Sequence, residues 1–327
     1  MPPSRESSNF DPAIQSEDIA FAADELNACP KCGRRNAPDR ANCLYCGAPI
    51  EIDGLGDTLK TRKLEAWERG WNVIAISSHS PDEHRAAQLL GMSSETMSAI
   101  LQSGAVLPVA RVENGRVAEL LGQTLKDCGI RTLIVSDKQL TPDQQPVRLR
   151  GVEFGGTELK LLHFNTSEAS SVSYSELAVM VNGLIAEDRT SSVEKRRRNK
   201  EAKVLDSRQE SSDRAVLDLY ARDDPRGFRI YPTGFDFSFL GEGKSLFAID
   251  NLRQLVDKLG QAAPGSRLID HYRSVAGLLG EIWEPESRQE GTGIVRLGYG
   301  KRGWGSVATT SNMVQFTKYS RLQWHLL

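Results

Sequence analysis

The stretch Cys29-Pro-Lys-Cys32, followed after ten residues by Cys43-Leu-Tyr-Cys46, is the part of the chain whose spacing alone dictates a chemistry. Two cysteines separated by two residues form a tight turn, and two such turns facing each other supply four thiolates in a tetrahedron. Gly33 and Gly47 follow the two pairs, at the point where the backbone of such a turn needs a positive φ. The pattern predicts one bound zinc ion, with four ligands: Cys29, Cys32, Cys43 and Cys46.

This metal is expected to be structural. A module of fewer than about 40 residues buries too little apolar surface to fold alone, so the ion must supply the stability. Cysteine fills all four ligand positions and leaves none open for a substrate. Two surface disulfides are the alternative, but the chain begins without a secretory signal, and paired CxxC turns favour a metal. Iron is a second alternative, which the short gap between the pairs disfavours.

The sequence CPKCGRRNAPDRANCLYCGAPI, residues 29–50, resembles the four-cysteine zinc ribbons of many prokaryotic multidomain proteins. Its spacing, with Asn36 between the two cysteine pairs, is also similar to the Ran-binding-protein-type zinc finger. Members of that family bind single-stranded RNA, ubiquitin or other proteins. This chain has Asn27 where that family usually carries tryptophan two residues before the first cysteine.

Length and composition indicate a multidomain protein. The 327 residues have room for two or three domains, and 39% hydrophobic with 26% charged residues is typical of soluble globular proteins. A net charge of −2 argues against a dedicated nucleic-acid coat protein. No apolar run approaches the roughly 18 residues of a membrane span. We expect a cytoplasmic protein, in which the fifth cysteine, Cys128, is a buried and inert thiol.

The segment 71–140 has the clearest alternation of helices and strands. We expect the order β-α-α-β-α-β, with the strands at 72–76, 105–112 and 130–135. The first helix should begin with Ser80 as N-cap, Pro81 at the first helical position and Glu83 closing a capping box. A second helix should begin near Ser93 and stop at Gly104, and a third should stop at Gly129.

This order resembles the small domain shared by the C-terminal part of the bacterial ribosomal stalk protein and the Clp-protease adaptor for N-terminal degrons. Both are protein-binding modules without enzymatic activity, so residues 72–136 are expected to form a protein-docking domain. The adaptor recognises its degron with an Asn-Asp pair after the first strand and a histidine on a helix. Ser77-Ser78-His79 follows that strand here, so the resemblance implies docking but no degron recognition.

From Val147 onward the hydrophobic pattern has a period of two and predicts an antiparallel β-rich domain over 147–285. Its last strand is indicated by the strict alternation of Phe235, Phe237 and Phe239. Residues 186–214 hold nine Lys/Arg and seven Asp/Glu and are expected to form an exposed insertion. Two helices follow, at 249–259 and 272–283. Residues 147–260 loosely resemble a pleckstrin-homology-like domain.

Three further sequence patterns suggest functional sites but have simpler structural explanations. His79, Asp82 and His84 offer metal-ligand chemistry, but a capping box accounts for this stretch without a metal. Gly298–Gly303 matches a dinucleotide-binding string but lacks the helix and the acidic residue that the fingerprint needs. The basic run Lys195–Arg198, with Lys200, is flanked by acids and is interpreted as a solvated loop.

The tail, residues 286–327, combines cations with aromatic residues. The combination is typical of proteins that bind single strands by stacking and phosphate contacts, although a hairpin with inward-facing aromatics fits as well. Its members are Arg296, Tyr299, Lys301, Arg302, Trp304, Phe316, Lys318, Tyr319, Arg321 and Trp324.

The sequence as a whole predicts a multidomain α+β protein without a catalytic site. The expected parts are a disordered N-terminus (1–25), the zinc ribbon (26–50), a linker with a helix (51–70), the docking domain (71–140), the β-rich domain (147–285) and short strands in the tail (286–327). We expect a zinc-binding adaptor or scaffold with protein partners. Binding of RNA or single-stranded nucleic acid through the zinc finger and the tail is the alternative.

Overall fold

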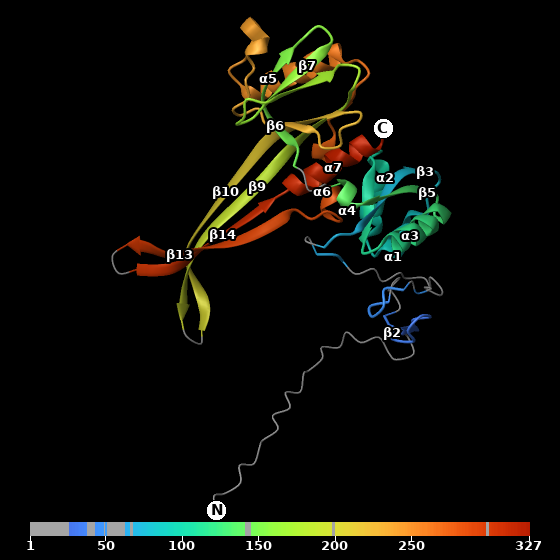
Figure 1. Ribbon diagram of the computed structural model, residues 1–327. Coiled ribbons are helices and arrows are strands. Elements are labelled where there is room, and N and C mark those ends of the chain that lie inside the picture. The colour runs from blue at the N-terminus through green and yellow to red at the C-terminus, as the bar shows by residue number, and fades with distance from the viewer. Residues whose placement is uncertain are drawn as a thin grey trace, which may run out of the picture. The chain divides into compact units, whose positions relative to one another are not determined.

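The computed structural model describes residues 26–37, 43–48, 50, 63–65, 68–140, 145–197, 200–298 and 301–327 (Figure 1). It divides into two compact units, residues 1–60 and 61–327. The chain is mixed α+β and rich in strands, as the sequence indicates. The expected disorder of residues 1–25 concerns a segment outside the described residues.

The described residues of the first unit form a small apolar core. Strand β1 (Asn27–Ala28) pairs antiparallel with β2 (Arg35–Asn36). Its buried hydrophobic cluster consists of Cys29, Cys43 and Ile50, with Ala48 packed against them. Two of these three buried side chains are cysteines, so cysteine dominates the part of this core that the structure describes.

The second unit begins with a three-stranded antiparallel sheet in the order β4-β3-β5. The predicted β-α-α-β-α-β order is confirmed, and one short helix, α4, follows the last strand. The elements are β3 (Trp71–Ser78), α1 (Glu83–Leu90), α2 (Ser94–Gln102), β4 (Leu107–Val112), α3 (Gly115–Asp127), β5 (Ile130–Ser136) and α4 (Asp137–Leu140). The helix expected between 58 and 69 is absent from its described residues, 63–65 and 68–69.

The start of α1 differs from the prediction. Asp82, and not Ser80, is the N-cap, and its carboxylate accepts a hydrogen bond of 3.0 Å from the Arg85 backbone N–H. Ser80 has a φ of 44°, so it belongs to the preceding turn. The predicted cap of α2 is confirmed, because the Ser93 hydroxyl accepts a 3.0 Å bond from the Thr96 N–H.

The predicted helix stops and the fifth cysteine agree with the structure. Gly104 and Gly129 have positive φ values of 65° and 78° just beyond the ends of α2 and α3. Cys128, the C-cap residue of α3, is 2% exposed, and burial raises the pKa of its thiol. A protonated, covered thiol fits the interpretation of Cys128 as inert.

A nine-stranded sheet forms the rest of the second unit, in the order β13-β14-β9-β10-β11-β6-β7-β8, with β12 also paired to β9 (Figure 1). Its strands are β6 (Val147–Phe154), β7 (Glu158–His163), β8 (Ala169–Ser173), β9 (Leu177–Arg197), β10 (Lys200–Ala221), β11 (Phe228–Ile230), β12 (Arg267–Ile269), β13 (Glu286–Gly298) and β14 (Lys301–Ser311). Helices α5 (Ala248–Ala262) and α6 (Tyr272–Gly280) match the two predicted helices. Leu252, Leu255 and Leu259 of α5 join the main hydrophobic core.

The strand expected at Phe235, Phe237 and Phe239 is not formed. Asp236 makes an isolated bridge to Gly151, and the chain then enters a 3₁₀ helix, η1 (Ser238–Gly243). Phe235 and Phe237 are both buried, with ring centroids 4.9 Å apart. The alternating phenylalanines therefore fill the core from a turn and do not line one face of a strand.

The described part of the insertion at 186–214 is regular β-structure; residues 204–214 are exposed, as expected, but most of 186–194 is half-buried. It forms the outer part of the β9–β10 hairpin, and the β13–β14 hairpin extends the same sheet, because β14 pairs with β9 from Trp304↔Glu194 to Ser311↔Glu187 (Figure 1). We call these four strand segments, residues 187–197, 200–213, 286–298 and 301–311, the arm.

The tail ends in a helix that the sequence analysis missed, α7 (Met313–His325). Phe316 and Tyr319 are fully buried, and Arg321 is 1% exposed. The Phe316 ring lies so close to Gly183 of β9 that a side chain at that position would collide with it. This part of the tail belongs to the core and cannot form a binding surface. Of the helices that the structure describes, none has the length and apolarity to cross a membrane.

Candidate metal centre

The two CxxC turns of the first unit have the backbone geometry that their sequence predicts. Gly33 donates a 2.9 Å hydrogen bond to the Cys29 carbonyl, and Gly47 donates one of the same length to the Cys43 carbonyl. The φ values of the two glycines are 70° and 69°. A side chain at either position would strain the turn, since only glycine adopts this conformation at little cost.

The turns bring together the four predicted ligands, Cys29, Cys32, Cys43 and Cys46. Their sulfur atoms all lie within 4.8 Å of one another. The Cys29 and Cys46 sulfurs are 3.6 Å apart and the Cys32 and Cys43 sulfurs 3.5 Å apart, far longer than the roughly 2.05 Å of a disulfide. All four are free thiols. Sulfurs about 2.3 Å from a tetrahedral metal lie about 3.8 Å apart, so the donor set fits such an ion.

Asn36 connects the two turns. Its side-chain N–H donates to the Arg34 carbonyl at 2.8 Å, and its side-chain oxygen accepts a 2.8 Å bond from the Leu44 backbone N–H. The same amide nitrogen lies 3.5 Å from the Cys43 sulfur. Asn36 is 4% exposed, so its buried side chain links the two cysteine turns by hydrogen bonds. Groups in this position orient metal ligands and support their affinity.

The pKa values of the cysteine thiols differ. Burial raises the pKa of Cys43, but the backbone N–H groups of Tyr45 and Cys46 outweigh it and hold that pKa at about 6. For Cys32, an N–H bond at Arg34 lowers the pKa, while burial and the neighbouring sulfurs raise it to about 12. Four thiolates this close repel one another, so a bound cation is needed to hold all four deprotonated.

The second CxxC turn also exposes apolar side chains. Leu44 and Tyr45 lie between its cysteines and are 65% and 55% exposed. The Arg34 guanidinium stacks over the Tyr45 ring, 4.6 Å from its centroid. The turn that anchors two of the metal ligands therefore presents an apolar surface beside a cation.

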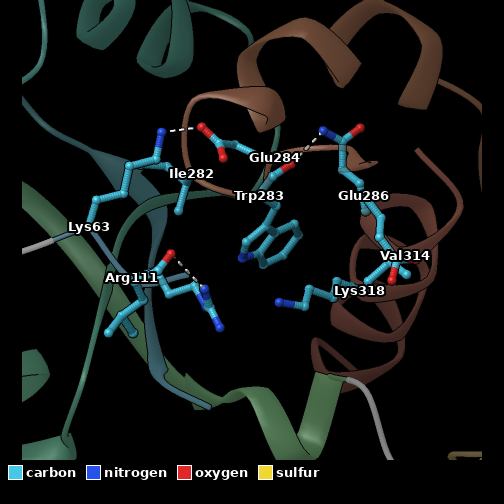
Figure 2. Close-up of a pocket in the computed structure, with 10 residues that line it drawn as sticks. Lys63, Arg111, Ile282, Trp283, Glu284, Glu286, Val314 and Lys318 are labelled. Carbon is cyan, nitrogen blue, oxygen red and sulfur yellow. Dashed lines mark hydrogen bonds and ion pairs between the residues drawn. The ribbon is translucent and has the colours of Figure 1, made fainter. Parts of the chain in front are cut away.

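A second candidate is a small cavity of about 80 Å³ in the second unit (Figure 2). Lys63, Arg111 and Lys318 line it, beside Trp283 and Glu284. Their charged groups are already engaged, since Lys63 forms an ion pair with Glu284 and the other two contact Asp137. The cavity thus offers packing and ion pairs, and it brings together none of the residue sets that the sequence analysis weighed as catalytic or ligating.

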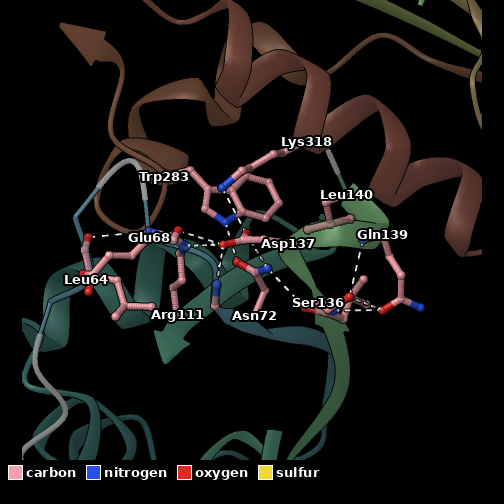
Figure 3. Close-up of polar contacts among 12 residues, drawn as sticks. Leu64, Glu68, Asn72, Arg111, Ser136, Asp137, Gln139, Leu140, Trp283 and Lys318 are labelled. Atoms are coloured by element: carbon pink, nitrogen blue, oxygen red, sulfur yellow. Dashed lines mark hydrogen bonds and ion pairs between the residues drawn. The ribbon is translucent and has the colours of Figure 1, made fainter. Parts of the chain in front are cut away.

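Asp137 is the centre of these contacts (Figure 3). Its carboxylate is 2.7 Å from the Arg111 guanidinium and 3.0 Å from the Lys318 ammonium, and it accepts hydrogen bonds from the Gly70 N–H and the Asn72 side chain. Burial raises the pKa of Asp137, but these partners lower it below its ordinary value.

The Asp137 cluster holds the three-stranded sheet to the C-terminal elements. Asn72 of β3 accepts a 2.7 Å bond from the Trp283 indole N–H, and the Trp283 carbonyl accepts one from Gln315 of α7. Sequence reasoning missed this cluster, because its members lie up to 181 residues apart and no local pattern links them. Its role is structural.

The other sequence-level candidates do not form sites. Asp82 caps α1, and the His84 ring bonds to Ser94. Gly298 ends strand β13 and Lys301 begins the antiparallel strand β14, whereas the dinucleotide fingerprint would need a helix after the glycines. Within the part of the chain that the structure describes, the four cysteines are the single group of three or more potential ligands close enough to hold a metal.

Comparison of the chain with known protein families, with curated proteins and with solved structures finds no match.

Proposed function

We propose that this chain is a cytoplasmic, non-catalytic adaptor in which a structural zinc ion fixes an apolar turn that binds a protein partner. The observation that carries the proposal is the exposure of Leu44 and Tyr45 between two metal ligands. Zinc suits four cysteine ligands whose site leaves no position open. A cytoplasmic location keeps the thiols reduced and available to it.

The chemistry of the turn suits a protein interface. Aromatic residues and arginine are enriched where interfaces gain most of their energy, and Tyr45 with Arg34 supplies both. The metal and Asn36 hold the backbone of the turn in place, so little conformational entropy is lost when a partner binds. The resemblance of residues 72–136 to protein-docking modules supports the same function.

The test is recovery of partners from native extract on the immobilised full chain. We expect Leu44→Ser combined with Tyr45→Ser to keep one zinc per chain but lose specific partners at least tenfold. Cys43→Ser should lose the same partners together with the metal. Leu246→Ser is the matched control, because Leu246 is a fully exposed leucine of the second unit. Unchanged recovery with the Leu44 and Tyr45 variant would refute the proposal.

The alternative, nucleic-acid binding through the zinc finger and the tail, loses part of its basis. Phe316, Tyr319 and Arg321 are buried in α7 and cannot contact a ligand. Arg302 and Trp304 remain exposed, on the arm.

A further inference from the structure

Charge is unevenly distributed along the arm. Its outer segments, 194–205 and 294–304, hold nine Lys/Arg and two Glu in the sequence. The rest of the 186–214 stretch holds three Lys/Arg and five Asp/Glu. The whole stretch is nearly neutral because its positively charged outer end is balanced by a negatively charged part nearer the core.

The strand register places cations directly opposite each other at this end. Arg296 pairs with Arg302 in the β13–β14 hairpin, and Lys195 pairs with Lys203 in the β9–β10 hairpin. Like charges in directly opposed positions destabilise a sheet. Among the described residues, Lys195, Arg296 and Arg302 have no carboxylate partner. The chain thus carries a concentration of positive charge at a cost to its own stability.

Nearer the core the arm is neutralised. Arg189 lies opposite Glu210, and Arg214 forms a 3.2 Å ion pair with Glu187. Arg208 pairs with Glu210 at 2.8 Å. The cation pairs are confined to the outer end, so they do not reflect the general composition of the arm.

A row that crosses all four strands beside Arg296 and Arg302 carries three exposed apolar side chains and one half-buried glutamate. Ile294, Trp304, Glu194 and Val204 are consecutive partners across all four strands, so their side chains lie on one face. Ile294 is 64% exposed and Trp304 52%. Arg296 and Arg302 are two residues further along the same strands and share this face. Beyond Trp304↔Glu194 the two hairpins no longer pair, and their ends separate (Figure 1).

We propose that the outer end of the arm binds single-stranded nucleic acid, with bases stacking on Trp304 and phosphates contacting Arg296 and Arg302. Cations for the backbone and an exposed aromatic face for the bases are what sequence-independent single-strand binding requires. A phosphodiester chain has the complementary charge and relieves the repulsion between the opposed cations. Stacking on Trp304 needs an unpaired base, which separates this ligand from a duplex.

The pairing of Trp304 with Glu194 places the start of the basic run, Lys195–Arg197 of β9, on the same sheet as the tail strand β14. The proposed nucleic-acid site differs from the proposed protein interface, which lies in the first unit and uses other residues, so either can fail alone.

The test is fluorescence anisotropy of a labelled 20-nucleotide oligo-dT with the full chain, over about 50–200 mM salt. Single-strand binding loses about 0.7 in the slope of log K against log salt per phosphate contact. Arg296→Gln with Arg302→Gln should therefore weaken binding and reduce the slope by about 1.4. Trp304→Ala should weaken binding about tenfold at an unchanged slope, since stacking involves no phosphate.

Arg208→Gln is the matched control, because Arg208 is an exposed arginine of the same arm with a carboxylate partner. It should change neither the affinity for the oligonucleotide nor the salt slope. Each variant is checked for its zinc content and melting temperature. In the free protein, Arg302→Gln should raise the melting temperature slightly, because it removes the repulsion from Arg296.

Three outcomes would overturn the proposal. The first is no salt-dependent binding of the oligonucleotide. The second is equal binding of a duplex of the same length with no effect of Trp304→Ala. The third is binding of vesicles containing phosphatidylserine that Arg296→Gln with Arg302→Gln abolishes while the oligonucleotide stays unbound, which would identify an anionic lipid surface as the ligand.

Discussion

The four-cysteine module and the helix α7 place their interacting groups in opposite ways. Among its described residues the module has three buried hydrophobic side chains, two of them cysteines, and local spacing brings its four sulfurs within 4.8 Å of one another. Helix α7 buries Phe316, Tyr319 and several polar residues against elements from the whole second unit. A short segment can thus have its interacting groups close together in sequence, or more than a hundred residues away, as Lys318 and Asp137 are.

The largest expected effect separates the two units. Cys43→Ser should abolish stoichiometric zinc binding and unfold the module, because the remaining core cannot support it. The second unit should keep its melting temperature, as a separate compact body. Metal analysis and calorimetry of the same preparation check both expectations. Cys128→Ser is the control and should retain one zinc per chain. An unchanged metal content in Cys43→Ser would contradict the prediction that the four cysteines bind the ion.

The next effect concerns the buried charges that hold α7 in place. Asp137→Asn leaves Arg111 and Lys318 without their carboxylate, which should cost about 3–5 kcal/mol of unfolding free energy. Glu284→Gln removes the exposed partner of Lys63 in the same region and should cost less than about 1 kcal/mol. Urea denaturation measures both. Equal losses in the two variants would show that burial of this charge is unimportant.

The stability difference between the wild type and Asp137→Asn should depend on pH. The pKa of Asp137 is lowered in the folded state, so its contribution is complete at neutral pH and is lost as the pH falls below the unfolded value of about 3.9. The stability difference between the wild type and Asp137→Asn should therefore narrow below about pH 4.

The smallest effect tests a purely local feature. Asp82→Ala should cost about 1 kcal/mol, because it removes the cap of α1. Ser80→Ala should change stability by less than about 0.5 kcal/mol, since Ser80 lies in the turn before the helix. Urea denaturation again provides the measurement, and a larger loss from Ser80→Ala would restore the cap that the sequence suggested.

Sequence reasoning succeeded where the controlling interactions are short-range. The CxxC spacing, the Ser93 cap and the stops at Gly104 and Gly129 are each set within a few residues. Ser80-Pro-Asp82 offers two successive caps, and a single sequence does not choose between them. The period-two pattern of the phenylalanines at 235–239 predicts a strand, although a turn also brings such residues into a core.

The remaining features depend on long-range pairing. The arm exists because β14 pairs with β9 across more than a hundred residues, as in Thr190↔Ala308. Helix α7 has no clear apolar stripe, because it buries Gln315, Thr317 and Arg321 along with its aromatic residues. A helix that buries polar groups on several sides gives no amphipathic period, so its position could not be predicted.

The order in which the ribosome makes these elements has a consequence for folding in the cell. Helix α7 is made after every other described element, and its Lys318 is made 181 residues after its partner Asp137. At about 5–20 residues per second that interval is on the order of 10–40 s. Until Lys318 is made, the Arg111 guanidinium is the cation beside Asp137, and once Gly183 is made the face over it stays open until Phe316 follows. The second unit therefore completes its core only when α7 has been made, and we expect a chain that stops before Met313 to be less stable than the full chain.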